Sequence, residues 1–254
     1  MKIITCCKIV PNEEEIKVLP NRELSMEDIS WKISQYDLNA LESGKQLAAA
    51  TGGTMTALSI GGNAALEATK IRKDVLSRGA DDLSLVIDDN HTFSDSLETA
   101  KTIAGALKAC GDYDVVLCGM GSSDMYAQEV GIQVGMLLNL PAVNNVTGIK
   151  VSDDGSLEVE RTLEDEVEVL LVSLPAVLSV SSEINIPAVP SMREIMRAGK
   201  KPVNVLPIVD GIAPSIKMLE QLAPKQQERR QEIVEGDNAD AVAALVSFLK
   251  KEGL

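Results

Sequence analysis

Residues 119–131 have the composition of a turn that could hold a phosphate group. They read Gly-Met-Gly-Ser-Ser-Asp-Met-Tyr-Ala-Gln-Glu-Val-Gly, they follow a short apolar run, and they lead into a helix predicted over residues 124–138. Small residues let a phosphate approach the backbone, and the first N–H groups of a helix favour an anion. The spacing is neither G-x-G-x-x-G nor that of a Walker loop. A plain tight turn with a Ser or Asp cap explains the segment about as well.

Three further turns are predicted along the same edge of the sheet, at residues 6–8, 34–37 and 60–63. In open α/β sheets, ligands bind in the crevice outside the carboxyl ends of the strands. We therefore expect an adenosine-binding cleft at this edge. The candidate cofactor-binding residues are Cys6, Lys8, Ser34, Tyr36, Asp37, Ile60, Gly61, Asp124, Tyr126, Ala127, Gln128, Val130, Gly131 and Val134.

Residues that could perform catalysis do not stand out. The sequence shows no obvious nucleophile–base pair or carboxylate dyad, and Cys6, Cys7, Cys110 and Cys118 include no C-x-x-C spacing. We expect the cysteines to be buried reduced thiols, with Cys6 and Cys7 on opposite faces of a strand. The only histidine, His91, lies in a polar stretch typical of a solvated loop. The sequence therefore predicts a binder or carrier with no catalytic residues and no metal site.

The elements that must position these turns alternate along the first part of the chain. Strands are predicted over residues 2–9, 54–60, 83–87 and 115–118, with a short edge strand over 16–19. Helices are predicted from 34 to about 52, over 63–78, over 96–110 and over 124–138. Capping is expected from Ser34 with Asp37, from Asn63, and from Asp95 with Glu98. This alternation predicts an α/β fold with a doubly wound, mostly parallel sheet.

The pattern changes after Pro141. Short strands are predicted over residues 147–151, 157–163, 167–172 and 176–180, with a tight turn at residues 153–155. From residue 182 onward prolines and a charge cluster at 225–235 interrupt the pattern, and one amphipathic helix is predicted over 239–251. We predict an α/β domain over residues 1–181, a loop over 182–200 and an extended arm over 201–254. Packing of the arm on its own domain and packing on a partner chain are about equally expected.

Composition narrows the function classes. Hydrophobic residues make up 45% of the chain and aromatic residues only 2%, so the core must be aliphatic, as in a parallel sheet covered on both faces. A formal net charge of -14 disfavours binding to nucleic acid. No apolar run has the length that a membrane span requires, and no signal-peptide cleavage pattern follows the N-terminal strand. We expect a cytoplasmic protein.

Several blocks resemble the beta subunits of electron-transfer flavoproteins. Residues 33–42, 75–81 and the start of the 124–138 segment resemble family stretches, with Ser34-Gln35 replacing the usual Asn-Pro. The most specific match is an ordered set over residues 159–202 that ends in P-S-M-R-E-I-M-R-A-G-K-K-P. The resemblance covers about residues 1–205. The sequence at residues 32–37 and 123–128 is most similar to that of the bacterial Fix and carnitine-linked branch.

This resemblance implies a Rossmann-like fold of the adenine-nucleotide alpha-hydrolase type and an electron carrier rather than an enzyme. It implies a heterodimer with an alpha subunit that carries FAD, and either AMP or, in electron-bifurcating members, a second FAD in the cleft. Residues 182–200 would form the loop that docks an acyl-CoA dehydrogenase-type flavoenzyme, and residues 201–254 would wrap the alpha subunit. The docking residues implied are Met192 as an apolar anchor, with Arg193, Ile195 and Met196.

Two alternatives remain open at this point. Met192 either enters a pocket on the partner or folds back onto Ile195 and Met196. The whole chain is either a subunit of an electron carrier or a stand-alone adenine-nucleotide binder similar to universal-stress proteins. The docking loop and the coreless tail favour the subunit, because a monomer has no use for either.

Overall fold

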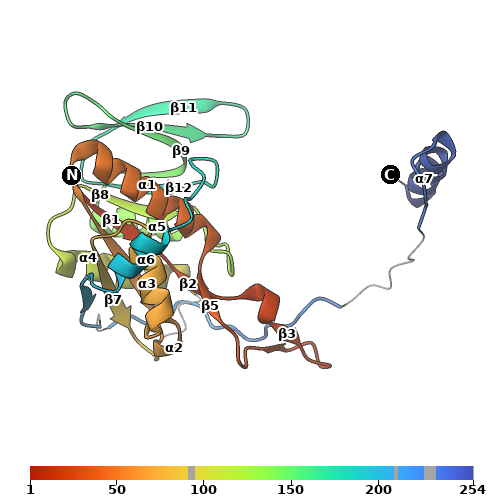
Figure 1. Ribbon diagram of the computed structural model, residues 1–254, viewed down its shortest axis with the longest axis horizontal. Helices are drawn as coiled ribbons and strands as arrows, with labels where there is room; N and C mark the ends of the chain where they lie inside the picture. Colours follow the sequence, from red (N-terminus) through yellow and green to blue (C-terminus); the bar gives the residue numbers. More distant parts are fainter. Residues whose placement is uncertain (91–94, 209–210, 226–232, 254) are drawn as a thin grey trace.

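A mixed β-sheet forms the centre of the molecule in this computed structural model, which describes residues 1–90, 95–208, 211–225 and 233–253. Within these residues nine strands form the main sheet in the order β11-β10-β9-β12-β8-β1-β6-β7-β13 (Figure 1). The parallel part comprises β1 (Lys2–Cys6), β6 (Thr54–Gly61), β7 (Asp82–Ile87), β8 (Val115–Gly119), β12 (Ala176–Val180) and β13 (Val203–Val205). The predicted doubly wound, mostly parallel α/β fold is confirmed.

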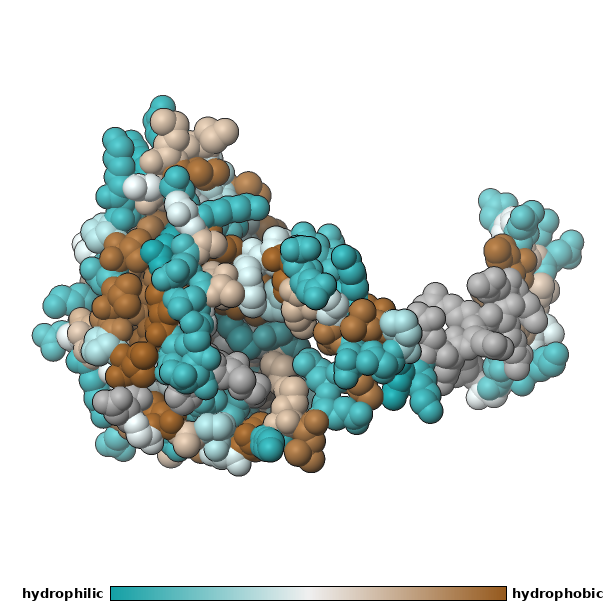
Figure 2. All heavy atoms as spheres, turned by 90° about the horizontal axis from the view of Figure 1, so that it is seen from below, coloured by the Kyte–Doolittle hydropathy of each residue, from teal (hydrophilic) through white to brown (hydrophobic). Residues whose placement is uncertain are grey.

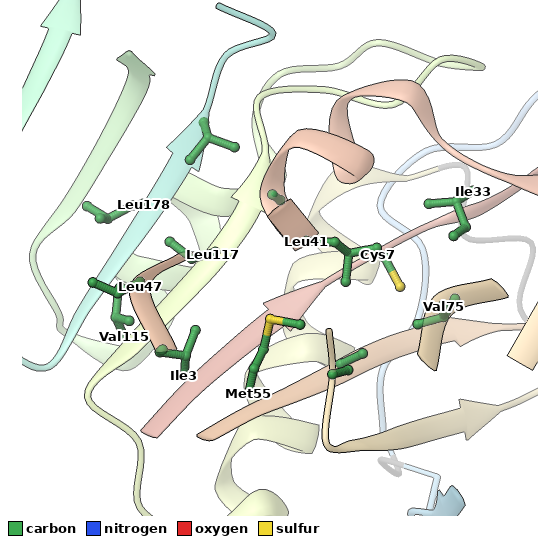
Figure 3. Packing of buried hydrophobic residues seen from close by; sticks show 14 of the residues in the cluster. Ile3, Cys7, Ile33, Leu41, Leu47, Met55, Val75, Val115, Leu117 and Leu178 are labelled. Carbon is green, nitrogen blue, oxygen red and sulfur yellow. The ribbon is translucent and has the colours of Figure 1, made fainter. Parts of the chain in front are cut away.

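Helices cover both faces of this sheet. The cluster on one face takes side chains from α1 (Gln35–Thr51), α2 (Asn63–Leu66), α3 (Thr69–Ser77) and α6 (Met192–Ala198). The cluster on the other face takes them from α4 (Ser96–Cys110) and α5 (Val130–Leu138). Figure 3 shows the first cluster, in which strand residues such as Ile3, Met55, Leu117 and Leu178 lie near Leu41 and Leu47 of α1. The core is aliphatic, as the composition predicted.

Helix α1 lies unusually close to the sheet at Gly44. A Cβ atom at this position would come within 2.4 Å of Met55 Sδ and 2.5 Å of Thr5 Oγ1. Glycine therefore lets the helix pack directly on β1 and β6. This contact sets how closely the middle of α1 approaches the sheet.

The antiparallel end of the sheet follows the predicted pattern. Strand β9 (Ala142–Val151) pairs with β10 (Leu157–Thr162), which pairs with β11 (Val167–Val172). The tight turn at residues 153–155 forms as predicted, with Gly155 at φ 85°. Strand β9 begins five residues earlier than the predicted start at 147, because Ala142 and Val143 pair in parallel with β12.

Two helix predictions were wrong, and one strand prediction is confirmed in a shorter form. The helix predicted over 63–78 is two helices, α2 and α3. Asn63 does not cap α2, because the N-cap residue is Gly62 and the side chain of Asn63 donates a hydrogen bond to Asp89 instead. The strand predicted over 16–19 is β3 (Lys17–Val18), which pairs with β4 (Leu24–Ser25) in a separate hairpin outside the main sheet. The helix predicted over 124–138 begins only at Val130, because residues 120–129 form an irregular loop.

The C-terminal part leaves the sheet after one further strand. Strand β13, which the sequence did not predict, pairs with β7 at the edge of the sheet. Helix α7 (Ala239–Glu252) has no buried residue, and Figures 1 and 2 both show it standing apart from the main body. In the segment between β13 and α7, Ala223 N donates a hydrogen bond to Arg22 O, and the Arg22 guanidinium donates one to Ala223 O. These two bonds join the β3–β4 hairpin to the arm. None of the helices in the described part of the chain has the length and apolarity that a bilayer crossing needs.

Candidate functional site

A cavity opens at the carboxyl ends of β1, β6 and β8, where the cleft was predicted. Its empty space is about 820 Å³ when the open mouth and the solvent in it are included. The walls come from the strand ends, from helix α4 and from the loop before α5. The lining residues are Cys6, Cys7, Lys8, Asp37, Leu58, Ile60, Ser96, Thr99, Ile103, Cys118, Gly119, Met120, Gly121, Ser122, Met125, Ala127, Gln128, Glu129 and Val130.

The carboxylate of Asp37 ties together three elements at one wall of this cavity. Its Oδ2 accepts a hydrogen bond from Lys8 N at 2.7 Å, and its Oδ1 accepts one from Gly119 N at 3.1 Å. A Cβ at Gly119 would come within 2.6 Å of this Oδ1, so only glycine permits the contact. The predicted capping box between Ser34 and Asp37 is therefore wrong. Asp37 instead joins the ends of β1 and β8 to the start of α1.

Burial raises the pKa of Asp37 to about 7, and the hydrogen bonds from Lys8 N and Gly119 N offset only part of this effect. In the unfolded chain the pKa of aspartate is about 3.9, so the folded state binds the proton more tightly. The contribution of Asp37 to stability is therefore fully present below about pH 4 and is lost as the pH rises towards 7.

We expect Asp37→Asn to remove this pH dependence, because the amide does not ionise. Urea unfolding of both proteins between pH 4 and 8 should show their difference in unfolding free energy changing with pH, by roughly 4 kcal/mol at most. The wild type should lose stability relative to the variant as the pH rises. The variant will also carry a constant cost, since asparagine offers one acceptor oxygen for two N–H donors. A constant difference across the whole range would contradict the prediction.

Lys8 supplies the one positive charge among the described residues that line the cavity, and it is already paired. Its Nζ lies 2.7 Å from Asp124 Oδ2, with both side chains about 30% exposed or less. Burial opposes ionisation of Asp124, but the hydrogen bonds from Lys8 and Ser122 outweigh it and lower the pKa of that carboxyl. Asp37 and Glu129 also line the cavity. An anionic ligand must therefore share Lys8 with Asp124.

The loop over residues 119–129 is held by contacts that the sequence did not reveal. Ser123 N donates to Ser34 Oγ at 3.2 Å, and Met120 N donates to Val180 O at 2.8 Å. The ring of Tyr126 lies 5.2 Å from that of Tyr36, centroid to centroid. Tyr126 and Gln128 adopt φ values of 47° and 61°, which non-glycine residues seldom adopt. These contacts and turns account for the late start of α5.

The structure brings together about half of the predicted binding residues at the cavity surface. Cys6, Lys8, Asp37, Ile60, Ala127, Gln128 and Val130 line the cavity. Ser34, Tyr36, Asp124 and Tyr126 lie directly behind or beside it through the contacts described above. Gly61 continues β6 beyond Ile60. Val134 is fully buried in the hydrophobic cluster under α5 and does not line the cavity.

Gly131 has a packing role that is independent of any ligand. A Cβ at this position would come within 2.0 Å of Ser179 Oγ on β12. Glycine therefore sets how closely α5 approaches the sheet, and a bulky substitution there would disturb this contact whatever the cavity holds.

Sequence reasoning missed the wall contributed by α4. Ser96, Thr99 and Ile103 line the cavity from this helix, and Ser96 Oγ donates to Glu129 Oε2 at 2.6 Å. Their spacing of three and four residues is the one available signal, since it places them on one helix face. His91, predicted in a solvated loop nearby, lies outside the described residues. The four cysteines are free, and Cys110 is only partly buried.

A second surface of interest is the loop around α6. Ser191 and Glu194 form a capping box at the start of this helix, and Ala198 at its end is buried. Asn185 fastens the loop to α1 through hydrogen bonds with Asn39 and Ser43. Five apolar side chains remain between 41% and 93% exposed, and we call them the α6 patch: Ile186, Val189, Met192, Ile195 and Met196. Arg193 and Arg197 are exposed beside them. Met192 is 75% exposed, so it does not fold back onto its neighbours.

Comparison with known families agrees with this geometry. A family model described as the electron transfer flavoprotein domain matches residues 24–210. This range includes most of the cavity wall and the whole α6 patch. Proteins of this family are electron carriers that bind flavin and work with a partner subunit and with dehydrogenases. Since the match covers well over half of the sequence, the chain belongs to the electron transfer flavoprotein domain family.

Proposed function

We propose that this chain is the beta subunit of a heterodimeric electron-transfer flavoprotein whose alpha subunit carries FAD. The observation that carries this proposal is helix α7, which has no buried residue and exposes Val242, Leu245, Val246 and Leu249 along one stripe. Exposed apolar stripes of this kind are interaction surfaces or aggregation hazards in soluble proteins. An alpha subunit that covers the stripe explains why the arm extends from the main body.

The cavity is the proposed site of an adenine nucleotide, either AMP or the adenosine part of a second FAD. Its apolar floor suits an adenine ring, and the amide groups at the start of α5 together with Lys8 suit a phosphate. Gly119 and Gly121 keep side chains out of the wall, since a Cβ on either would overlap a neighbouring residue. A bound FAD would supply a carrier of one or two electrons, whereas AMP would supply structure only. The residues proposed here bind and shield the nucleotide.

The α6 patch is the proposed docking surface for an acyl-CoA dehydrogenase-type flavoenzyme, with Met192 as the anchor and the two neighbouring arginines at the rim. The resemblance of the segment around Met192 to the family's recognition loop supports this choice of partner. We place the complex in the cytoplasm.

Co-expression with a candidate alpha subunit tests the proposal directly. We expect a yellow heterodimer to purify with the full chain, and we expect deletion of residues 239–254 to weaken assembly at least tenfold, because the apolar stripe of α7 is lost. Assembly is measured by analytical ultracentrifugation over a range of concentrations. Thermal unfolding of the deleted chain should stay cooperative, since α7 contributes nothing to the core.

The matched control is Leu171→Ala, which removes a 69% exposed apolar side chain from β11, outside the arm. Equal assembly of the full and the shortened chain would contradict the role of α7. A colourless homodimer that binds ATP would instead support the stand-alone nucleotide binder.

A further inference from the structure

Two thiols lie side by side on the floor of the cavity. Cys6 ends β1 and Cys118 lies near the end of β8, and both line the cavity. The two strands pair in parallel with Ile3 opposite Val115 and Thr5 opposite Leu117, so the same register places Cys6 opposite Cys118. Both side chains belong to the hydrophobic cluster on one face of the sheet, whereas Cys7 belongs to the cluster on the other face.

The spacing of these thiols suits a covalent bond between them. Neighbouring strands lie about 4.8 Å apart, and disulfides join residues whose Cα atoms are about 4.4 to 6.8 Å apart. A hydrogen bond to Cys118 is the largest cause, before burial, that raises the pKa of the Cys6 thiol. The strand register and the shared hydrophobic cluster thus place the two side chains next to each other on the same face of the sheet. Cys6 is 7% and Cys118 is 5% exposed, so a reagent must reach them through the cavity.

We propose that Cys6 and Cys118 form a dithiol site that hydrogen peroxide entering the cavity converts to an intramolecular disulfide. One thiol loses its proton and its sulfur attacks a peroxide oxygen, which breaks the O–O bond and gives a sulfenic acid and water. The second sulfur attacks the sulfenic sulfur, the S–S bond forms, and the leaving hydroxide takes the remaining proton as a second water. Two thiols are oxidised, and one peroxide is reduced to two waters.

This site is coupled by position to the ligand cavity. The disulfide would join the strand ends directly beneath Asp37, which binds the backbone of Lys8 and Gly119 just beyond the two cysteines. If the cavity holds an adenine nucleotide, which rests on the function proposed above, the nucleotide covers both sulfurs. Oxidation is then expected in the empty protein and suppressed in the loaded one.

The experiment uses the full chain with Cys110→Ser, which removes the partly exposed cysteine and leaves Cys6, Cys7 and Cys118. Hydrogen peroxide is added to the nucleotide-free protein, and thiols are counted by alkylation after denaturation. We expect the count to fall from three to one, with a Cys6–Cys118 link between peptides in the mass spectrum. Adding Cys118→Ser should abolish the link, and adding Cys7→Ala should leave it intact.

Thiols that stay reduced, or a link that includes Cys7 instead of Cys118, would overturn the proposal. The peptide map of the Cys110→Ser protein decides the matter even if a further variant does not fold. A second arm repeats the oxidation with saturating AMP, which should slow it by about tenfold or more. A disulfide that forms equally fast with AMP supports the dithiol site and counts against the proposed nucleotide position. Failure of the dithiol proposal and failure of the proposed nucleotide site therefore give different results.

Discussion

Met192→Ala is expected to weaken docking of an acyl-CoA dehydrogenase-type partner by about 1–3 kcal/mol, or about 5- to 150-fold in the dissociation constant. Met192 is 75% exposed at the start of α6, and the Ser191–Glu194 capping box holds this turn in place. Because the backbone of this turn is already fixed, docking costs conformational entropy mainly in the methionine side chain, so part of the apolar transfer free energy remains available for binding. Interface energy is concentrated in a few buried anchors of this kind.

The measurement compares two electron donors. Flavin reduction by dithionite should be equal in the wild-type and variant complexes, because the α6 patch does not hold the flavin in this proposal. Reduction by the dehydrogenase should show a raised half-saturation concentration. Met136→Ala is the matched control, since Met136 is 74% exposed on α5, away from the α6 patch. An equal loss in both variants, or none in either, would remove Met192 from the docking surface.

Lys8→Ala is expected to lower the affinity for AMP by about 10- to 100-fold. A hydrogen bond to a charged group contributes about 1.5–3 kcal/mol, and Lys8 supplies the one positive charge among the described lining residues. The variant also leaves the carboxylate of Asp124, the ion-pair partner of Lys8, without a cation to balance it. Both effects act against a phosphate.

The variant Asp124→Asn should change the affinity in the opposite direction. Asp124 holds Lys8 Nζ at 2.7 Å, so removing its charge releases Lys8 to the phosphate and takes one negative charge from the mouth of the cavity. We expect AMP to bind about 2- to 5-fold tighter, because a partly exposed ion pair contributes up to about 1 kcal/mol.

Calorimetric titration of the purified complex with AMP at several salt concentrations measures both effects, and Lys8→Ala should also flatten the salt dependence. Lys32→Ala is the matched control, because it breaks the ion pair with Glu13 on residues that do not line the cavity. Unchanged affinity in Lys8→Ala, or weaker binding in Asp124→Asn, would place the phosphate elsewhere.

The sequence by itself determined the order and type of most elements. Apolar runs rich in Ile, Val and Leu marked β1, β6, β7 and β8, and Gly52 ended α1 at the predicted position with φ 60°. Asp95 capped α4 as predicted, by accepting from Leu97 N. Cys6 and Cys7 lie on opposite faces because side chains alternate along any strand. Each of these outcomes depends on residues close together in the chain, so a local pattern suffices to predict it.

Only the tertiary structure decided how the cavity wall is made. Asp37 binds Lys8 and Gly119, and Lys8 meets Asp124 across 116 positions of sequence. These contacts removed Asp37 from the capping role that local spacing predicted, and α5 starts only at Val130. Burial changed the chemistry further by raising the pKa of Asp37. The physical reason is that a buried polar group binds whichever donors the packed elements bring within reach, and the chain order does not reveal which donors those are.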